Sequence, residues 1–220
     1  MAAWSRVLER FVDDDGRVAF KQLAQDRADL AEFVEFVAKS APHTRAEWFP
    51  TRAAKIAFHL NAYNAMAMHA VLEGGIAESL GGLNKYWFVG VTSHRIAGQD
   101  LILHRYETDF IRTLGEPRIH FVLNCMSVGC PRLPRTPINA ARLEHDLDQA
   151  TRFFLTDARN VHVDHSARSV WLSEIFDFFP EDFLQSSPSI VAYVNRYRAE
   201  QIPDNYAVQF IDYDWTVNAQ

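Results

Sequence analysis

The chain has 220 residues, of which 48% are apolar, and its formal net charge is −6. This length is sufficient to bury one core, and we expect residues 1–220 to form a single globular domain. A negative chain without a basic stripe lacks the surface that binds phosphates, so no nucleic-acid partner is expected. No segment is apolar over the length of a membrane span, and the amino terminus lacks the apolar core of a secretory signal. The sequence therefore predicts a soluble, cytoplasmic protein without a membrane partner, and leaves open a leader removed by processing.

Apolar residues at helical spacing predict the elements of the first third of the chain. Short helices are expected over 4–12, 21–25 and 27–40, with a brief extended piece at 17–20. The segment 51–73 is apolar nearly all round, which is typical of a central helix. Thr51 is its predicted N-cap, and Gly74-Gly75 ends it.

After residue 82 the apolar pattern changes to that of strands and shorter helices. The expected strands are 87–91, 95–97, 101–103, 118–124, 161–163, 170–172 and 208–213. The expected helices are 104–114, 139–156 capped by Asn139, a short one from Ser173 to Phe178, and a last one opened by Ser187-Pro188. This order favours an α+β fold, with helices packed around a long central helix and a small, mostly antiparallel sheet built from hairpins.

Cys125 stands where the apolar run 118–124 meets a bend punctuated by glycine and proline. The end of a strand can hold a side chain firmly and still expose it to a ligand. Strand alternation places Cys125 on the apolar face and His120 on the opposite one, which favours an inert buried thiol and separates the two side chains. The bend 127–131 is either a backbone nest for an anion or an ordinary turn stiffened by Pro131.

The chain has only two cysteines, Cys125 and Cys130. Their spacing permits a disulfide without requiring one, and the CxxC spacing of a zinc site is absent. A phosphate-binding loop, a dinucleotide fingerprint and a nucleophile elbow are also absent from the sequence, so no cofactor and no metal are expected.

A cysteine nucleophile needs a base within hydrogen-bond reach and a lowered pKa. His69, on the rigid central helix, is the preferred base, and Glu107 is the candidate carboxylate that orients it. Two further carboxylate groups, Glu181-Asp182 and Asp212-Tyr213-Asp214, are predicted to be surface or cap groups.

Asn61 and Asn64 lie inside the central helix, where an asparagine side chain competes with the backbone and needs partners of its own. They either pin neighbouring loops to the helix or line a ligand pocket.

The segments Ala57–Ala65, Leu103–Glu107 and Pro117–Pro131 together resemble the domain of unknown function 547 family. Val170–Phe176 and Tyr213–Trp215 are similar as well. The resemblance implies a single α+β domain whose activity is not settled. It also implies a shared constellation of Asn61, Tyr63, Asn64, Glu107, His120 and Cys125. His59 departs from the family pattern, in which an aromatic residue, often tryptophan, is expected. The first cysteine persists in plant-like members and the second does not, which implies that Cys130 is not essential and a disulfide not obligatory.

Two hypotheses of function follow. The first is a cysteine-dependent hydrolase or acyl transferase acting on small peptide-like amides, with Cys125, His69 and Glu107 as catalytic residues. Its ligand-binding residues would be Asn61, Tyr63, Asn64, His120, Asn124 and Ser127. The alternative is a non-catalytic module that binds a small ligand or a protein partner. A purely structural domain would require Cys125 to be wholly buried.

Overall fold

The computed structural model describes residues 1–82 and 92–220, so the strand expected at 87–91 lies outside the described residues. The first half of the chain is helical, as the periodicity predicts. Its elements are α1 (Ala2–Phe11), α2 (Phe20–Leu23), α3 (Ala28–Lys39), the 3-10 turn η1 (Ala46–Trp48) and α4 (Arg52–Glu73).

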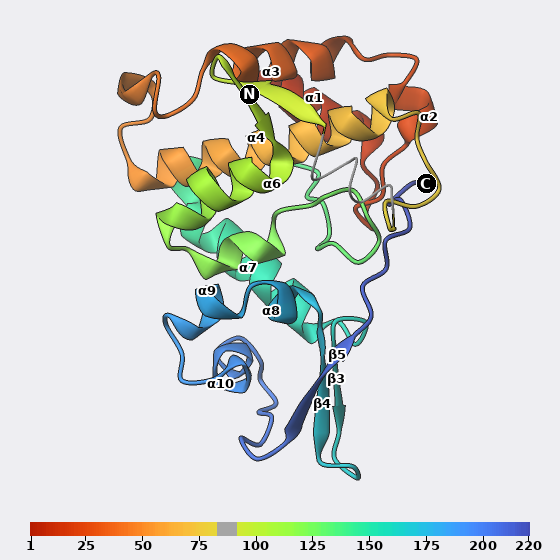
Figure 1. Ribbon diagram of the computed structural model, residues 1–220, viewed down its shortest axis with the longest axis vertical. Coiled ribbons are helices and arrows are strands. Elements are labelled where there is room, and N and C mark those ends of the chain that lie inside the picture. Colours follow the sequence, from red (N-terminus) through yellow and green to blue (C-terminus); the bar gives the residue numbers. More distant parts are fainter. Residues whose placement is uncertain (83–91) are drawn as a thin grey trace.

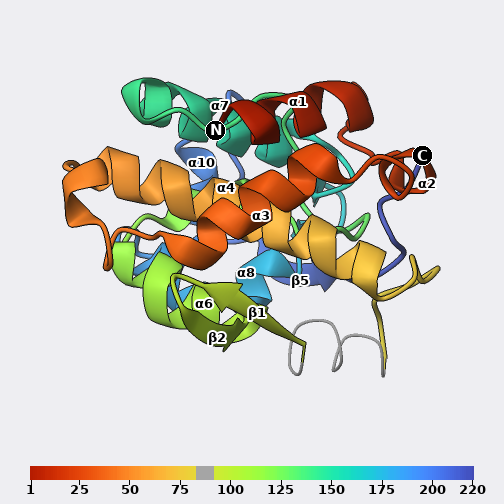
Figure 2. The ribbon, with the colours of Figure 1, turned by 90° about the horizontal axis from the view of Figure 1, so that it is seen from above.

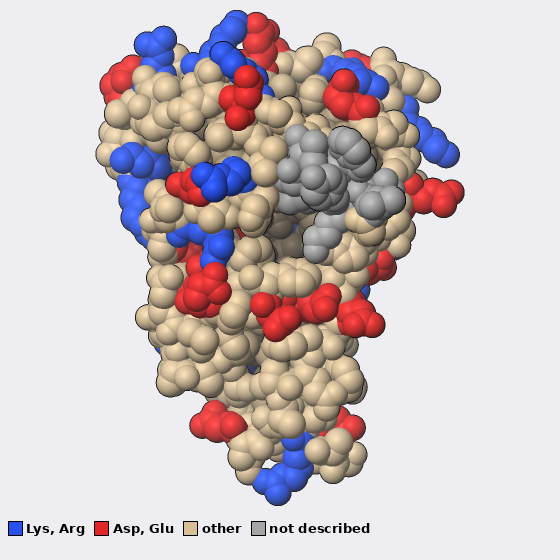
Figure 3. Space-filling view, viewed as in Figure 1, with Lys and Arg blue, Asp and Glu red and all other residues tan. Residues whose placement is uncertain are grey.

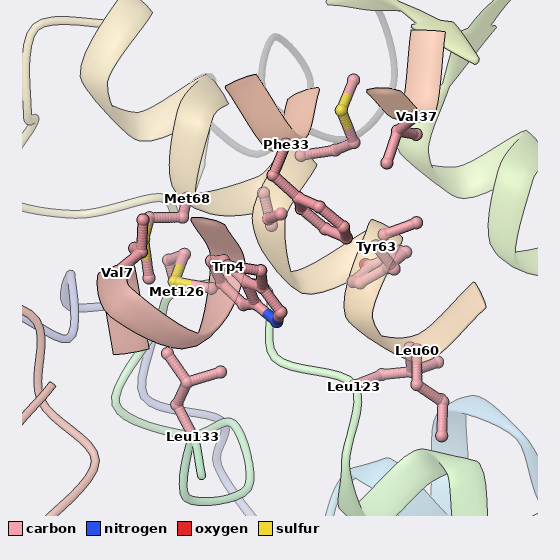
Figure 4. Close-up of a cluster of buried hydrophobic side chains, with 14 of the residues drawn as sticks. Trp4, Val7, Phe33, Val37, Leu60, Tyr63, Met68, Leu123, Met126 and Leu133 are labelled. Carbon is pink, nitrogen blue, oxygen red and sulfur yellow. The ribbon is translucent and has the colours of Figure 1, made fainter. Parts of the chain in front are cut away.

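The helix α4 is the central element. Every residue from Ile56 to Met68 is buried, and the Thr51 hydroxyl caps the helix by accepting the Ala54 N–H at 3.1 Å. The helices α1, α3 and α4 lie alongside one another (Figure 2), and the Trp4 ring stacks on Phe33 with centroids 5.7 Å apart. Side chains from these three helices gather in one apolar cluster, in which Tyr63 also lies (Figure 4). The prediction of a central helix is therefore confirmed.

The middle of the chain begins with the expected hairpin of β1 (Ser93–Ile96) and β2 (Gln99–Ile102). The helix expected over 104–114 is present as three consecutive helical pieces. They are α6 (Leu103–Tyr106), the π-helical turn η2 (Glu107–Ile111) and the 3-10 turn η3 (Arg112–Leu114). Single π turns inside helices often mark functional sites, and this one begins at Glu107.

The strand predicted over 118–124 is wrong. Residues Pro117–Phe121 form a 3-10 helix, η4, because Pro117 suits a first helical position and the Glu116 carboxylate accepts the Arg118 N–H. Both sides of the run are buried, because Ile119 belongs to one hydrophobic cluster and Phe121 to the other. A short, fully buried run does not distinguish a strand from a helix.

The second half of the chain contains the larger sheet. Its elements are η5 (Ala140–Arg142), α7 (Leu143–Thr156), β3 (Val161–Asp164), β4 (Ser169–Ser173), α8 (Ile175–Phe178), α9 (Pro180–Leu184), α10 (Ile190–Asn195) and β5 (Ala207–Ile211). The expected hairpin β3–β4 is antiparallel, whereas β5 joins β4 in parallel. Asn139 caps η5 as predicted, and Ser189 rather than Ser187 caps α10. The α+β fold with small, mostly antiparallel sheets is confirmed.

The helices α1 to α4 form the upper part of the molecule in Figure 1, and the larger sheet with α8 to α10 forms the lower part. Each part has its own cluster of buried side chains. After β5 the chain returns to the upper part, where Val217 bridges to Ser127 and Ala219 to Val18. Among the described helices there is none that combines the length and the apolarity needed to cross a membrane.

Candidate functional site

A cavity of about 310 Å³ lies between the two hydrophobic clusters. Its apolar wall includes Leu123, Ile175, Phe178, Phe179 and Trp215. The titratable side chains on its wall include Tyr63, Glu107, His120, Cys125, Cys130 and Tyr213. On the face shown in Figure 3 the surface is hollowed between α6 and α8, the elements that supply part of this wall, and acidic side chains gather below the hollow.

Two thiols meet in this cavity. The sulfur atoms of Cys125 and Cys130 are 2.8 Å apart, and both cysteines are free. Cys125 is partly exposed, whereas Cys130 is 4% exposed. The Cys130 sulfur accepts the Cys125 backbone N–H at 2.9 Å and the Tyr213 hydroxyl at 3.0 Å, and the Ser127 hydroxyl lies 3.3 Å away. This set of donors is suited to a thiolate.

The two thiols titrate as a pair that shares one proton. Burial opposes a charge on Cys130, but the hydrogen bonds from Cys125, Ser127 and Tyr213 outweigh it and lower the pKa of Cys130 to about 7. The hydrogen bond to Cys130, together with burial, raises the pKa of Cys125 well above its usual range. When the pair ionises, the negative charge therefore rests on Cys130, and Cys125 keeps its proton.

Buried amides hold the segment that carries the thiols. The side-chain oxygen of Asn64 accepts the backbone N–H of Asn124 at 2.8 Å, and its side-chain NH₂ group donates to the Val122 carbonyl at 3.1 Å. Asn124 in turn accepts the Met126 N–H and donates to the Pro131 carbonyl, both at 2.6 Å. Met126 has φ +69°, a left-handed conformation that costs a side chain about 1–2 kcal/mol. The amides hold this strained bend in place and so fix the direction of Cys125.

The backbone N–H groups of residues 128–130 donate to backbone carbonyls of the protein itself. The Val128 N–H donates to the Thr216 carbonyl and the Gly129 N–H to the Asp214 carbonyl, both at 2.8 Å. The Cys130 N–H closes a turn on the Ser127 carbonyl at 3.1 Å. Of the two interpretations of the bend 127–131, a nest for an anion and an ordinary turn, the structure therefore shows the turn. The alternative of an anion-binding nest does not hold for these three groups, because the returning carboxyl-terminal segment already uses two of them and the turn uses the third.

Tyr213 reaches the thiols because Gly129 leaves room for it. A β-carbon at Gly129 would lie 3.0 Å from the Tyr213 ring and 2.9 Å from the Asp214 nitrogen. The Tyr213 backbone N–H is held by the Glu174 carboxylate at 2.7 Å. Tyr213 was predicted to be a surface or cap residue, and the structure corrects this prediction. The glycine of the facing bend and the family resemblance of Tyr213–Trp215 are the sequence signals for its position.

Glu107 is a buried carboxyl group on the π turn. Burial is the main cause that raises its pKa to about 8. The Tyr63 hydroxyl is its hydrogen-bond partner on α4. Glu107 is consequently protonated at neutral pH, and it can donate a proton inside the cavity.

His120 is held by Asp182. The His120 Nε2 lies 2.7 Å from the Asp182 carboxylate, and its ring stacks on Phe179 with centroids 4.3 Å apart. Burial acts against the charge of Asp182, but hydrogen bonds from His120 and Arg112 hold its pKa to about 2. Because Asp182 is ionised, the imidazole proton belongs on Nε2, and the unprotonated Nδ1 faces Glu107 at 3.9 Å. Burial lowers the pKa of His120, so the ring is neutral.

This arrangement corrects two expectations. His120 and Cys125 line one cavity, although strand alternation placed them on opposite faces, because the segment is a 3-10 helix followed by a bend. Asp182 was predicted to be a surface or cap residue. Its side chain is only 12% exposed and is paired with His120 and Arg112. The sequence gives no signal for this contact, which joins positions 62 residues apart.

The remaining predicted residues lie elsewhere. His69 is six residues beyond Tyr63 on α4, about 9 Å along the axis, and it is not among the described residues that line the cavity. Burial lowers its pKa, and the neighbouring charges are those of Glu73 and Arg27. Asn61 accepts the Trp4 indole N–H and the Ile138 N–H, and its amide donates to two backbone carbonyls. The hydrogen bonds of Asn61, like those of Asn64 and Asn124, thus go to the scaffold.

Residues 49–155 match the sequence model of the family described as "Protein of unknown function, DUF547". The match covers just under half of the chain, and it confirms the resemblance noted from the sequence. The matched segment includes α4, Glu107, His120 and both cysteines, whereas Asp182 and Tyr213 lie beyond it. No curated protein and no solved structure matches the chain. Among the described residues, no three histidine, cysteine or carboxylate side chains are grouped as a metal site requires.

Proposed function

We propose that this protein is a cysteine-dependent acyl transferase or hydrolase that acts on small peptide-like amides with an apolar acyl group. The observation that carries the proposal is the contact between two thiols on the wall of a cavity that also holds a protonated carboxyl group. A nucleophile, a proton acceptor and a proton donor are thereby within one space. These are the groups that acyl transfer through a thioester requires.

In the proposed reaction Cys125 is the nucleophile, since it is the more exposed thiol. Its proton passes to the Cys130 thiolate, 2.8 Å away, as the Cys125 sulfur forms a bond to the substrate carbonyl carbon. The carbon–nitrogen bond then breaks, and the leaving amine takes the proton of Glu107. Water or another acceptor subsequently cleaves the thioester, returning the protons to Cys125 and Glu107.

The other groups position these three. The Tyr213 hydroxyl stabilises the Cys130 thiolate, so that this thiol can act as the base instead of His69. The Asp182–His120 pair presents an unprotonated nitrogen to Glu107, which favours a proton on the carboxyl group over a charge. The apolar wall accommodates a small acyl group and excludes water from the reacting carbon.

The test uses matched p-nitrophenyl esters and p-nitroanilides of small apolar acids, followed by absorbance and intact-protein mass. We expect one acyl group per chain, mapped to Cys125 by peptide mass spectrometry and absent in Cys125→Ser. A p-nitrophenolate leaves without a proton, whereas an amine needs one. Glu107→Gln should therefore slow anilide turnover by about 10²- to 10⁴-fold and ester turnover much less.

The matched control is Glu47→Gln, an exposed carboxylate on η1, which should change neither rate. The proposal is refuted if iodoacetamide alkylates Cys125 in the folded protein while no ester or anilide acylates it. Thermal stabilisation by these compounds that persists in Cys125→Ser, without turnover, would instead support the non-catalytic binding module.

A further inference from the structure

We infer that Cys125 and Cys130 are a redox-active pair, which a hydroperoxide converts to an intramolecular disulfide within the cavity. The two sulfur atoms are 2.8 Å apart, and a disulfide bond is about 2.05 Å long, so each sulfur needs to move by only a few tenths of an ångström. Cys130 ends the turn that its N–H closes on the Ser127 carbonyl at 3.1 Å, and Cys125 stands two residues before that turn.

The surroundings favour the oxidation chemically. A thiolate, not a thiol, attacks a peroxide. The Cys130 sulfur has the donors that stabilise a thiolate, and this thiolate can take the proton of Cys125 so that the Cys125 sulfur attacks. The partner thiol is already in contact, so an oxidised sulfur can be attacked before a second peroxide arrives. Cys125 also opens to the cavity, which gives a small hydroperoxide a route to it.

The reaction balances in two steps. The Cys125 proton passes to Cys130, and the Cys125 sulfur attacks the peroxide: a sulfur–oxygen bond forms, the oxygen–oxygen bond breaks, and the hydroxide released takes the proton from Cys130. The Cys130 thiolate then attacks the Cys125 sulfur. The sulfur–sulfur bond forms, the sulfur–oxygen bond breaks, and the second hydroxide is protonated by solvent. Both thiols are oxidised by one peroxide molecule, and an external dithiol reverses the change.

Oxidation of the pair would also control acyl transfer, an effect that rests on the proposed function. The disulfide removes both the nucleophile and its base, so acyl transfer stops until the pair is reduced. The disulfide itself does not depend on the existence of a substrate.

The experiment follows the mass of the whole protein without any substrate. The reduced chain is treated with hydrogen peroxide, and free thiols are then counted with N-ethylmaleimide. We expect the monomer to lose two hydrogen atoms and both alkylation sites, and to recover them with dithiothreitol. Dimedone, which traps sulfenic acids, should label the wild type hardly at all. It should label Cys125 strongly in Cys130→Ser, where no thiol is available to resolve the intermediate.

The inference is overturned if the wild-type chain gains oxygen atoms in place of losing hydrogen, or if the disulfide joins two chains. A second measurement is the rate in urea, where the turn is lost and disulfide closure should slow relative to dimedone capture. Equal rates in the folded and unfolded chain would mean that the fold does not preorganise the pair. Failure of the acylation test with success here would leave a redox pair without acyl transfer, so the two outcomes are separable.

Discussion

Glu107→Gln tests the electrostatics of the cavity through the stability of the protein. The Glu107 carboxyl group has a pKa of about 8 in the folded protein, against an ordinary value of 4.5. Between these two pH values the unfolded chain has lost this proton and the folded chain still holds it. The free energy of unfolding therefore falls as pH rises, by about 1.4 kcal/mol for each pH unit. From pH 5 to pH 8 the loss is about 4 kcal/mol, and below pH 4.5 this group contributes no pH dependence.

The measurement is urea unfolding of the wild type and of Glu107→Gln at intervals from pH 5 to pH 8. Glutamine has the same shape and no charge, so the variant should lack this part of the decline. Its free energy of unfolding should gain on that of the wild type as pH rises. Repeating the comparison with Cys125 and Cys130 replaced by serine shows how much of the effect needs the thiols. A difference between the two proteins that stays constant across this range would refute the burial argument, because Glu107 would then titrate normally in the fold.

Two further predictions concern the scaffold. Asn64→Ala leaves the buried Asn124 N–H and Val122 carbonyl without partners, which should lower the free energy of unfolding by about 2–5 kcal/mol in urea titrations; a loss below about 0.5 kcal/mol would show that water replaces the amide. Burial lowers the pKa of His59 to about 3 from 6.5, so the folded protein should lose about 3 kcal/mol of stability between pH 6.5 and pH 4. His59→Phe should abolish that loss, and thermal melts in which the variant and the wild type keep an unchanged offset over this range would contradict the assignment.

The sequence predicts the parts of this fold that rest on periodicity. The central helix and both described hairpins have long enough patterns, and clear enough turn residues, to be recognised without tertiary information. The conformation of segment 118–124 was not recognised from its periodicity, because the segment is buried on both sides. It is decided instead by Pro117 and by the ion pairs that Arg118 makes with Glu116, Glu144 and Asp148. The periodicity of apolar residues within the segment gives no information on those contacts.

The sequence predicts those residues of the candidate site that lie in one local segment or on a recognisable helix. Cys125 and Cys130 stand in one local segment, and Glu107 and Tyr63 belong to helices that the sequence indicates. The hydrogen bond from His120 to Asp182 and the one from Tyr213 to Cys130 join positions 62 and 83 residues apart. Such contacts depend on how the lower sheet returns the chain to the upper part, which a single sequence does not specify.

The family match covers only part of the candidate site. Residues 49–155 include the two thiols, Glu107 and His120, but not Asp182, which holds the imidazole, or Tyr213, which donates to the thiolate. An isolated 49–155 segment would keep the cysteines and lose a donor to the Cys130 sulfur, so the pKa of the thiol pair should rise toward that of an ordinary thiol. The carboxyl-terminal part of the chain therefore completes the set of donors around the Cys130 sulfur. A relative that lacks this part would need to supply an equivalent hydroxyl group from another element to keep a thiolate at neutral pH.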